Sequence, residues 1–373
     1  MADPVLELCK DGVAEELLFE TWCLLHQGNR HIGKALFASI PQASITNSRG
    51  IHISAMGTTG RGKTDSIEKA LLLIPNKYKF VGDLTPQSVY YNSDNISPGT
   101  IVYIDDIQWN PSNASTMKKI TSNFQQSVAK ATNFSGEGKT IAASERLTFW
   151  CSQVDMQVDE QLRDRFMMVE ATADPIKTVE FMQDQDVGVQ PAECELSDQI
   201  QLAQDIVTLI RESGPYKVRI PYARRIKGIR QNRAYKMFSD TIKASAVFNC
   251  WQRERDKDGY ILADESDFYY AKGIYDGIGG ISGDKFSQRE KMVLQAIRDN
   301  GGLATYSEIG DNIGEGKQTI WNIINGRSDN SQQRYGLAEK CGGMMKVESG
   351  RPVRIYLDPT FKFGEFSVWL DSS

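Results

Sequence analysis

The stretch IHISAMGTTGRGKT, residues 51–64, decides the interpretation of this sequence. Its first six residues alternate in the manner of a β-strand, and the next eight fit the pattern Gly-x-x-x-x-Gly-Lys-Thr. The residues that follow, DSIEKALLLI, are typical of a helix. A strand, a glycine-rich turn and a helix in this order gather backbone N–H groups and the positive end of a helix around one point. This arrangement predicts a site for phosphate, and the alternative is a chance match in a glycine-rich turn.

The loop predicts a role for each of its residues. Lys63 is expected to reach the outer phosphates of a nucleotide, and the Thr64 hydroxyl is expected to hold Mg²⁺. The cofactors predicted are therefore ATP and Mg²⁺. The remaining nucleotide-binding positions are the rest of the loop and the residue after it: Gly57, Thr58, Thr59, Gly60, Arg61, Gly62 and Asp65.

A second motif, TIVYIDD at residues 100–106, is an apolar run that ends in two carboxylates. A buried parallel strand delivers acids to its carboxyl end in this way. We expect Asp105 to lie on the metal side of the site and Asp106 to polarise the attacking water. The alternative is that the two acids only cap the next turn.

Residues 127–153, SVAKATNFSGEGKTIAASERLTFWCSQ, predict two extended segments around a Ser-Gly-Glu-Gly-Lys turn and then a buried strand. The strand ends in Ser152 and Gln153, which can hold the attacking water or sense the γ-phosphate. The hairpin is either an ordinary surface feature or a DNA contact, with Lys139 at its tip and Lys130 behind it.

The segment VDEQLRDRFMMVEA, residues 158–171, presents two arginines just before another apolar strand. One interpretation is an arginine finger that enters the ATP site of a neighbouring subunit, and Arg165 is favoured over Arg163 for that role. The other is a surface salt bridge to one of the nearby acids.

Taken in order, GTTGRGKT, IVYIDD, the hairpin, TFWCSQ and LRDRF resemble the AAA+ ATPases. Among these they look most like the minichromosome-maintenance-type helicases and their relatives on phages, plasmids and other mobile elements. The resemblance covers about residues 50–275 and implies an α/β core, with a parallel sheet between helices, and a helical lid. It also implies a hairpin that contacts DNA in a central pore, an arginine that acts in trans, and hexameric rings. Two departures are Asp106 in place of the usual Glu, and Ser152 with Gln153 in place of the common Asn.

The region after the core changes from acidic to basic. Residues 174–206 are acidic and polar and predict a solvated linker, although residues 199–214 also have the pattern of an amphipathic helix. Basic residues then recur between 217 and 243, where the resemblance places the lid. There an arginine at the start of a helix contacts the γ-phosphate, and Arg233 is the first choice, with Arg230 second. The alternative is a solvated cationic helix face.

The C-terminal part follows a flexible joint, GGISGD, at residues 279–284. Three helical stretches (286–302, 305–314 and 315–327) and two strands within 344–358 together describe a winged helix. Its third helix is the one that such domains place in a DNA groove, with Lys317, Gln318, Thr319 and Asn322 facing out. Arg351 and Arg354 on the wing would touch phosphate, and the alternative is a domain that contacts only protein.

Bulk properties set limits on the remaining questions. The chain has 373 residues, a formal net charge of −5 and six scattered cysteines. Any nucleic-acid surface must therefore be local, and a soluble cytoplasmic protein with reduced thiols is expected, in the host cell if a phage or plasmid encodes it. The predicted divisions are an N-terminal helical segment (1–48), the ATPase core (49–175), lid and linker (176–278), the winged helix (284–360) and a tail (361–373).

The function predicted from these motifs is an ATP-driven, ring-forming DNA helicase for replication of a mobile element. Its expected partners are DNA, other copies of the same chain in a hexamer, and a separate primase or polymerase. One rival is a replication initiator or helicase loader that binds DNA without unwinding it. Another is a sequence-specific DNA-binding regulator whose ATP site is structural.

Overall fold

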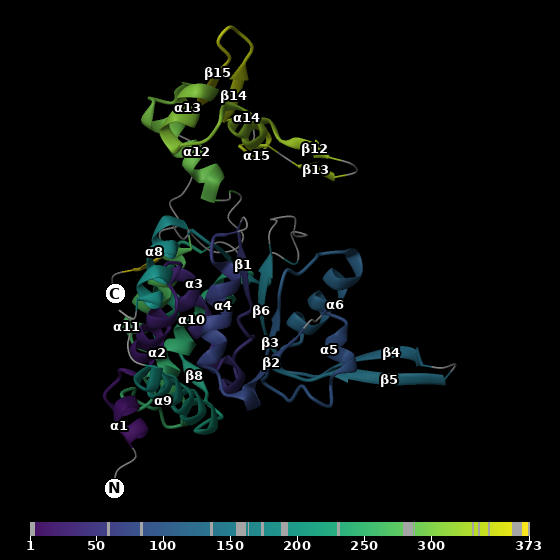
Figure 1. The fold of residues 1–373 in the computed structure, drawn as a ribbon, viewed down its shortest axis with the longest axis vertical. Coiled ribbons are helices and arrows are strands. Elements are labelled where there is room, and N and C mark those ends of the chain that lie inside the picture. The colour runs from purple at the N-terminus through teal and green to yellow at the C-terminus, as the bar shows by residue number, and fades with distance from the viewer. Residues whose placement is uncertain are drawn as a thin grey trace. The chain divides into compact units, whose positions relative to one another are not determined.

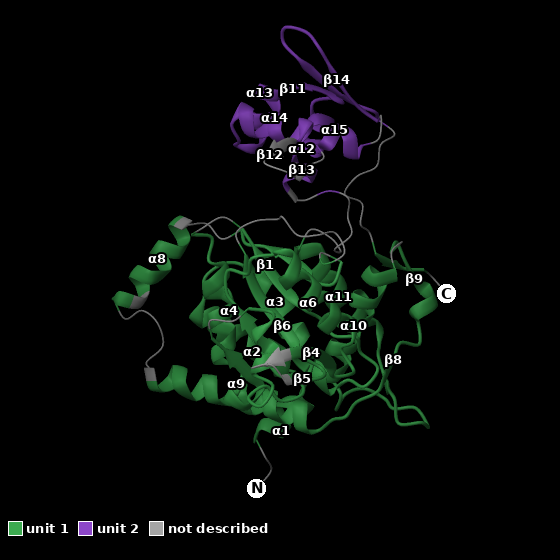
Figure 2. Ribbon diagram, turned by 90° about the vertical axis from the view of Figure 1, so that its right-hand side faces the viewer, with its two compact units in different colours: residues 1–283, 368–373 green, residues 284–367 purple. Residues whose placement is uncertain are grey.

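The computed structural model describes the chain in two compact units, which are coloured separately in Figure 2. Unit 1 comprises residues 1–283 and 368–373, and unit 2 comprises residues 284–367. Unit 2 is therefore inserted in the chain between two segments of unit 1. Among the described residues, no helix combines the length and the apolar character needed to cross a membrane. The described residues are 4–57, 60–82, 85–134, 137–153, 162, 164–172, 175–187, 193–229, 232–278, 286, 288–329, 332–334, 336–341, 344–359 and 368–371.

A five-stranded parallel sheet forms the centre of unit 1 (Figure 1). Its strands, in spatial order, are β2 (Lys79–Val81), β3 (Ile101–Ile104), β6 (Thr148–Gln153), β1 (Ile53–Met56) and β7 (Met167–Glu170). Strands β1, β3 and β6 are buried along their whole length, as expected for apolar runs in a sheet covered on both faces. The expected α/β nucleotide-binding fold is confirmed.

Successive side chains of a strand point to opposite faces of the sheet, and helices cover both faces here. On one face Phe149 and Cys151 pack in one apolar cluster with Met117 of α6 (Pro111–Ser122). On the other face the Trp150 indole donates to the Ser39 hydroxyl at 2.8 Å, at the end of α3 (Arg30–Ser39). The remaining helices of this region are α1 (Pro4–Lys10), α2 (Ala14–Leu25), η1 (Ile40–Ser44), α4 (Lys63–Leu72), η2 (Asn76–Tyr78) and α5 (Ser88–Tyr91).

The expected hairpin is present as a separate antiparallel pair, β4 (Val128–Phe134) and β5 (Glu137–Ala143), that projects away from the central sheet (Figure 1). Lys139 pairs with Thr132 inside the strands. It therefore does not lie in the turn, because the strands continue until Phe134 faces Glu137.

Helices and short strands follow β7. The prediction of a solvated linker over residues 174–206 is wrong, because α8 (Pro175–Asp186) and α9 (Glu193–Glu212) occupy most of it. Two aromatic contacts, Phe238 with Phe268 and with Tyr275, join α10 (Asn232–Phe248) to α11 (Glu265–Gly277) at centroid distances of 5.6 and 5.2 Å. The other elements are β8 (Val218–Arg219), η3 (Ala223–Arg225), β9 (Ile226–Lys227), α10 (Asn232–Phe248), β10 (Ile261–Leu262), α11 (Glu265–Gly277) and β16 (Trp369–Leu370), which pairs with β9.

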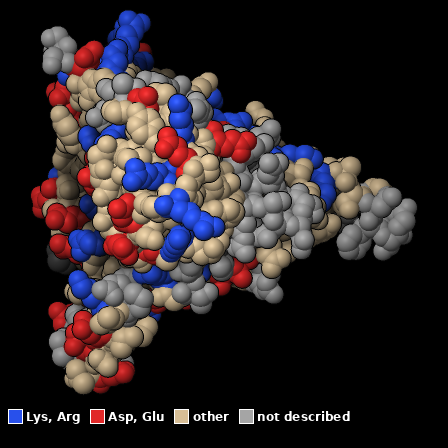
Figure 3. Space-filling model, turned by 90° about the horizontal axis from the view of Figure 1, so that it is seen from above, with Lys and Arg blue, Asp and Glu red and all other residues tan. Residues whose placement is uncertain are grey.

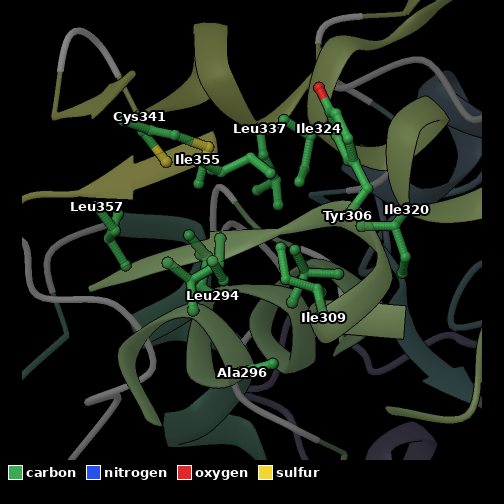
Figure 4. Close-up of a cluster of buried hydrophobic side chains, with 14 of the residues drawn as sticks. Leu294, Ala296, Tyr306, Ile309, Ile320, Ile324, Leu337, Cys341, Ile355 and Leu357 are labelled. Atoms are coloured by element: carbon green, nitrogen blue, oxygen red, sulfur yellow. The ribbon is translucent and has the colours of Figure 1, made fainter. Parts of the chain in front are cut away.

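Unit 2 has helices at the three expected places, α12 (Gln288–Asp299), α13 (Tyr306–Ile313) and α14 (Lys317–Asn325). A three-stranded antiparallel sheet accompanies them, in the order β11 (Leu303–Thr305), β15 (Arg354–Leu357) and β14 (Met345–Glu348). A pair β12 (Arg327–Asp329) and β13 (Gln332–Arg334) and the short helix α15 (Leu337–Lys340) were not foreseen. The hydrophobic core of unit 2, drawn in Figure 4, includes Leu294, Ile309, Ile320, Ile324 and Ile355.

Candidate nucleotide-binding site

The glycine-rich loop joins the carboxyl end of β1 to α4, whose first residue is Lys63. Gly62 has φ +72°, and a Cβ there would lie 3.1 Å from the Asn29 amide nitrogen and 3.2 Å from a ring carbon of His26. Only glycine combines this backbone conformation with so close an approach. Thr58 and Thr59 lie outside the described residues. Gly57 and Gly60 also have positive φ values, +147° and +81°.

Lys63 is the cation at the centre of this loop. The residue is only 8% exposed. Among the residues that the structure describes, its ammonium group has no hydrogen-bond or ion-pair partner. A lysine at the end of a glycine-rich loop and the start of a helix fits an anionic ligand such as the phosphates of a nucleotide.

Asp105, at the carboxyl end of β3, faces the start of α4. The Thr64 hydroxyl donates to its Oδ1 at 3.2 Å, the Tyr103 hydroxyl donates at 2.9 Å, and the Ser152 hydroxyl also donates to it. Burial by itself would raise the pKa of Asp105, but these hydrogen bonds and one from the Asp106 backbone outweigh burial and lower the pKa. Asp105 is therefore an ionised carboxylate next to a hydroxyl.

These oxygen atoms suit a hard divalent cation such as Mg²⁺. Within the described part of the chain, no group of three or more His, Cys, Asp and Glu side chains could hold a metal ion. A cation at Thr64 and Asp105 would thus complete its shell with water and with nucleotide oxygens, as Mg²⁺ usually does.

Strand β6 lies between β1 and β3, and this order places its last residues between the loop and the acids. Asp106 has φ +41°, and its backbone N–H donates to the Ser152 hydroxyl at 2.9 Å. The Trp109 indole donates to Gln153 Oε1, while the buried Gln153 Nε2 has no partner among the described residues. An amide donor is thus available beside the acid pair.

His26, between α2 and α3, contacts the start of α4, and no motif in the sequence indicates this contact. Its ring lies within hydrogen-bond distance of the Asp65 carboxylate on one side and of the Ser66 hydroxyl, at 2.9 Å, on the other. The Ser66 hydroxyl in turn donates to the Gly62 carbonyl at 2.6 Å. The side chain of His26 is almost fully buried, so the imidazole supports the loop from behind.

Asn29 makes a second link between the N-terminal helices and the loop. Its amide nitrogen donates to the Arg61 carbonyl at 2.8 Å, and its amide oxygen accepts from the Thr172 backbone at 2.9 Å. The Trp22 indole donates to the Ser66 carbonyl at 3.0 Å. Contacts between residues more than 30 positions apart follow no spacing rule, so only the fold reveals them.

The arginines lie at the opposite, amino end of the parallel strands. Arg165 lies two residues before the start of β7, and its guanidinium donates to the Lys118 carbonyl and to the Ser122 hydroxyl at the end of α6. Arg233, in the first turn of α10, is 3.3 Å from Asp164. Arg165 and Arg233 line one cavity of about 600 Å³. The structure therefore groups Arg233 with Arg165 rather than with Lys63, and Arg163 and Arg230 lie outside the described residues.

The residues predicted to contact DNA are dispersed. The Lys130 ammonium lies 5.6 Å from the centre of the Tyr90 ring, and the structure describes only the backbone of Lys139. In unit 2, Lys317 begins α14, and Arg351 is exposed between β14 and β15. Basic and acidic side chains are mixed on the face drawn in Figure 3.

The fold and the site define a P-loop nucleotide-binding protein. Residues 1–212 match the family described as "MTBMA_p00010 P-loop domain", and the chain belongs to that family. It is also similar to "Uncharacterized protein MTBMA_p00010" of Methanothermobacter marburgensis, with 23% identity over 349 residues that cover 84% of this chain and 43% of the relative. The chain spans less than half the length of this relative. A P-loop domain implies nucleotide binding, usually together with a divalent cation.

Proposed function

We propose that this protein is an ATP hydrolase of the AAA+ class, most similar to minichromosome-maintenance-type helicases, that forms a ring and unwinds DNA during replication of a mobile element. The observation that carries the proposal is the division of the site residues between two edges of one sheet. Lys63 and Thr64 lie at one edge, and Arg165 and Arg233 lie at the other.

This division fits a head-to-tail assembly. Residues at opposite ends of parallel strands cannot meet on one nucleotide within a chain without unfolding the sheet. A contact between the amino edge of one copy and the carboxyl edge of the next would bring them together, and a repeated head-to-tail contact closes into a ring when the rotation allows. A hexamer is the ring that we propose.

Each residue near the loop has a definable task. Bound ATP with Mg²⁺ supplies the β–γ phosphoanhydride bond that is cleaved. Lys63 neutralises phosphate charge, Thr64 and Asp105 hold the cation, and Asp106 orients the attacking water. Ser152 fixes the backbone of Asp106 through the 2.9 Å hydrogen bond.

Two further groups would act on the developing charge. Gln153 offers its amide nitrogen, which has no partner among the described residues, to the γ-phosphate or to the water. Arg165 of the adjacent copy would stabilise the charge of the transition state, and the Arg233 guanidinium beside it would contact the same γ-phosphate.

The projecting hairpin β4–β5 is the proposed motor contact, with Lys130 and Lys139 on a single strand of DNA that passes through the ring. Unit 2 is proposed to be a winged helix, because its three helices are followed by the antiparallel strands β14 and β15. Lys317 and Arg351 would contact DNA there. A separate primase or polymerase would complete replication.

Strand displacement tests this proposal against the loader alternative. The wild-type protein with ATP should separate a forked duplex, and Lys63→Ala should not, because it removes the phosphate-binding cation. DNA-stimulated ATP hydrolysis without strand displacement would instead indicate an initiator or loader. A Lys63→Ala variant that keeps its DNA-dependent activity would indicate a regulator with a structural nucleotide.

A further inference from the structure

Helix α14 of unit 2 presents one face that the sequence pattern did not reveal. Lys317, Trp321 and Asn325 recur every four residues and therefore lie on the same side of the helix. Ile320 and Ile324 lie on the other side and are fully buried. Trp321 is 44% exposed, although an indole of this size is more often buried.

This face of α14 forms one wall of a pocket of about 430 Å³. The volume lies within the range of sites for small organic groups. The start of α13 and the ends of β14 and β15 supply the other walls, with Thr305, Tyr306, Ser307, Val347, Ser349, Pro352 and Val353.

The pocket combines an aromatic surface with polar groups of both kinds. The Asn325 amide nitrogen donates to the Tyr306 hydroxyl at 2.8 Å and to the Trp321 carbonyl at 3.0 Å. These two bonds use both of its hydrogens, so the Asn325 amide oxygen remains as an acceptor. The Tyr306 and Ser307 hydroxyls can donate. Such a set matches the edge of a heterocyclic base, which carries donors and acceptors around an apolar ring.

The one charged side chain in the lining of the pocket is a cation, which favours an anionic ligand. Lys317 is the one charged residue among those that line it. Arg351 is exposed in the turn between the lining residues Ser349 and Pro352. Neither cation has an ion-pair partner among the described residues. An apolar peptide side chain would use the indole but would leave both cations without a role.

We propose that this pocket binds an unpaired base of single-stranded DNA, with the base stacked on Trp321 and an adjacent phosphate on Lys317. Stacking on an exposed aromatic side chain beside a cation is the usual way to hold a single strand without reading its sequence. The proposal rests on the proposed function in so far as unit 2 contacts DNA, but it replaces a duplex groove with a single strand at α14.

The test measures binding of the full chain to labelled oligothymidylate and to a blunt duplex of the same length. Trp321→Ala should weaken binding to the single strand about tenfold, because stacking contributes about 1–3 kcal/mol per base. Trp321→Phe should weaken binding to the single strand less than Trp321→Ala does. Lys317→Ala should also weaken binding to the single strand. Neither Trp321→Ala nor Lys317→Ala should change the affinity for the duplex. The matched control is Lys346→Ala. Lys346 is exposed and precedes the lining residue Val347 on β14, so its side chain points to the opposite face of the strand.

A second readout keeps the result independent of other DNA contacts in the chain. A single strand with 5-iodouracil, irradiated with the wild-type protein, should crosslink to the peptide that contains Trp321. Absence of this crosslink together with unchanged affinity in Trp321→Ala would overturn the proposal and leave the pocket for a protein ligand. Equal losses on single strand and duplex would also overturn it.

The same samples separate this proposal from the proposed function. Strand displacement with ATP reports on the motor and does not require Trp321 to stack on a base. Trp321-dependent binding in a protein that displaces no strand would retain the pocket and reject the helicase. Strand displacement by a protein whose binding to the single strand does not depend on Trp321 would retain the helicase and reject the pocket.

Discussion

The two edges of the central sheet differ in what they can do alone. At the carboxyl edge, Thr64 donates a hydrogen bond to Asp105, and Lys63 precedes Thr64 in the chain. The N-terminal helices support the loop there through His26 and Asn29. The amino edge holds Arg165 and Arg233 around a cavity and has no phosphate loop. The comparison shows that the loop and the arginines cannot meet on one nucleotide within a chain, and under the proposed function a second copy would supply the arginines.

The largest expected effect is at the amino edge. Arg165→Ala should lower kcat for ATP hydrolysis about a thousandfold and leave nucleotide affinity nearly unchanged, because a trans-acting arginine stabilises mainly the transition state. The measurement is steady-state hydrolysis with a nucleotide-binding assay. The control is Arg224→Ala, an exposed arginine that does not line the cavity. Equal rates for Arg165→Ala and the wild type would remove the amino edge from the reaction.

The next effect is at the carboxyl edge. Asp106→Asn should lower kcat about a hundredfold, since a positioned base contributes that much or more, and ATP should still bind. Asp106→Glu should retain hydrolysis because it keeps the carboxylate. Single-turnover hydrolysis measures both. If Asp106→Asn hydrolyses ATP at the wild-type rate, Asp106 only caps the turn.

A smaller effect is expected where the N-terminal helices support the loop. His26→Ala should raise KM about tenfold with a lesser change in kcat, because the loop loses the contacts with Asp65 and Ser66 that hold it in its binding conformation. His31→Ala is the control, since His31 contacts the Glu170 carbonyl instead. A loss confined to kcat would argue against a positioning role for His26.

The remaining effect concerns folding at the amino edge rather than activity. His52 lines the cavity, is fully buried among Phe124, Phe149 and Phe166, and burial lowers its pKa to about 3. The unfolded chain takes up a proton at His52 below about pH 6.5, whereas the folded chain stays neutral until about pH 3. The contribution of the neutral His52 to the free energy of unfolding is therefore fully present above about pH 6.5. It falls as the pH drops toward about 3, by up to about 1.4 kcal/mol per pH unit.

Chemical denaturation between pH 7 and pH 5 measures this slope. His52→Gln should reduce it, because the variant has no proton to take up in the unfolded chain. Identical slopes for the two proteins would show that other groups control the acid sensitivity.

The sequence predicted the parts of the fold that depend on local pattern. Apolar runs predicted β1, β3 and β6, and the glycine-rich loop with its lysine predicted the start of α4. The prediction failed at α8 because the acidic and polar composition of this segment resembles that of a linker. The structure shows a helix there whose apolar residues Ile176, Val179 and Met182 are exposed.

Features that depend on long-range contacts could not be predicted from the sequence. The place of Arg233 beside Asp164 follows from how α10 packs at the amino edge, and no spacing in the sequence indicates it. The support from His26 and Asn29 has no spacing signal. Trp321 has the spacing of a core residue next to Ile320 and Ile324, and only the surrounding pocket shows that it is exposed.

Mixing two inactive variants tests the division of the site most directly. Lys63→Ala keeps Arg165, and Arg165→Ala keeps the loop, so a one-to-one mixture that assembles should contain intact interfaces at about a quarter of its contacts. The account predicts that ATP hydrolysis returns in the mixture, although each variant alone is inactive. A mixture as inactive as its components, despite forming mixed oligomers, would contradict the claim that each site is completed by a second copy.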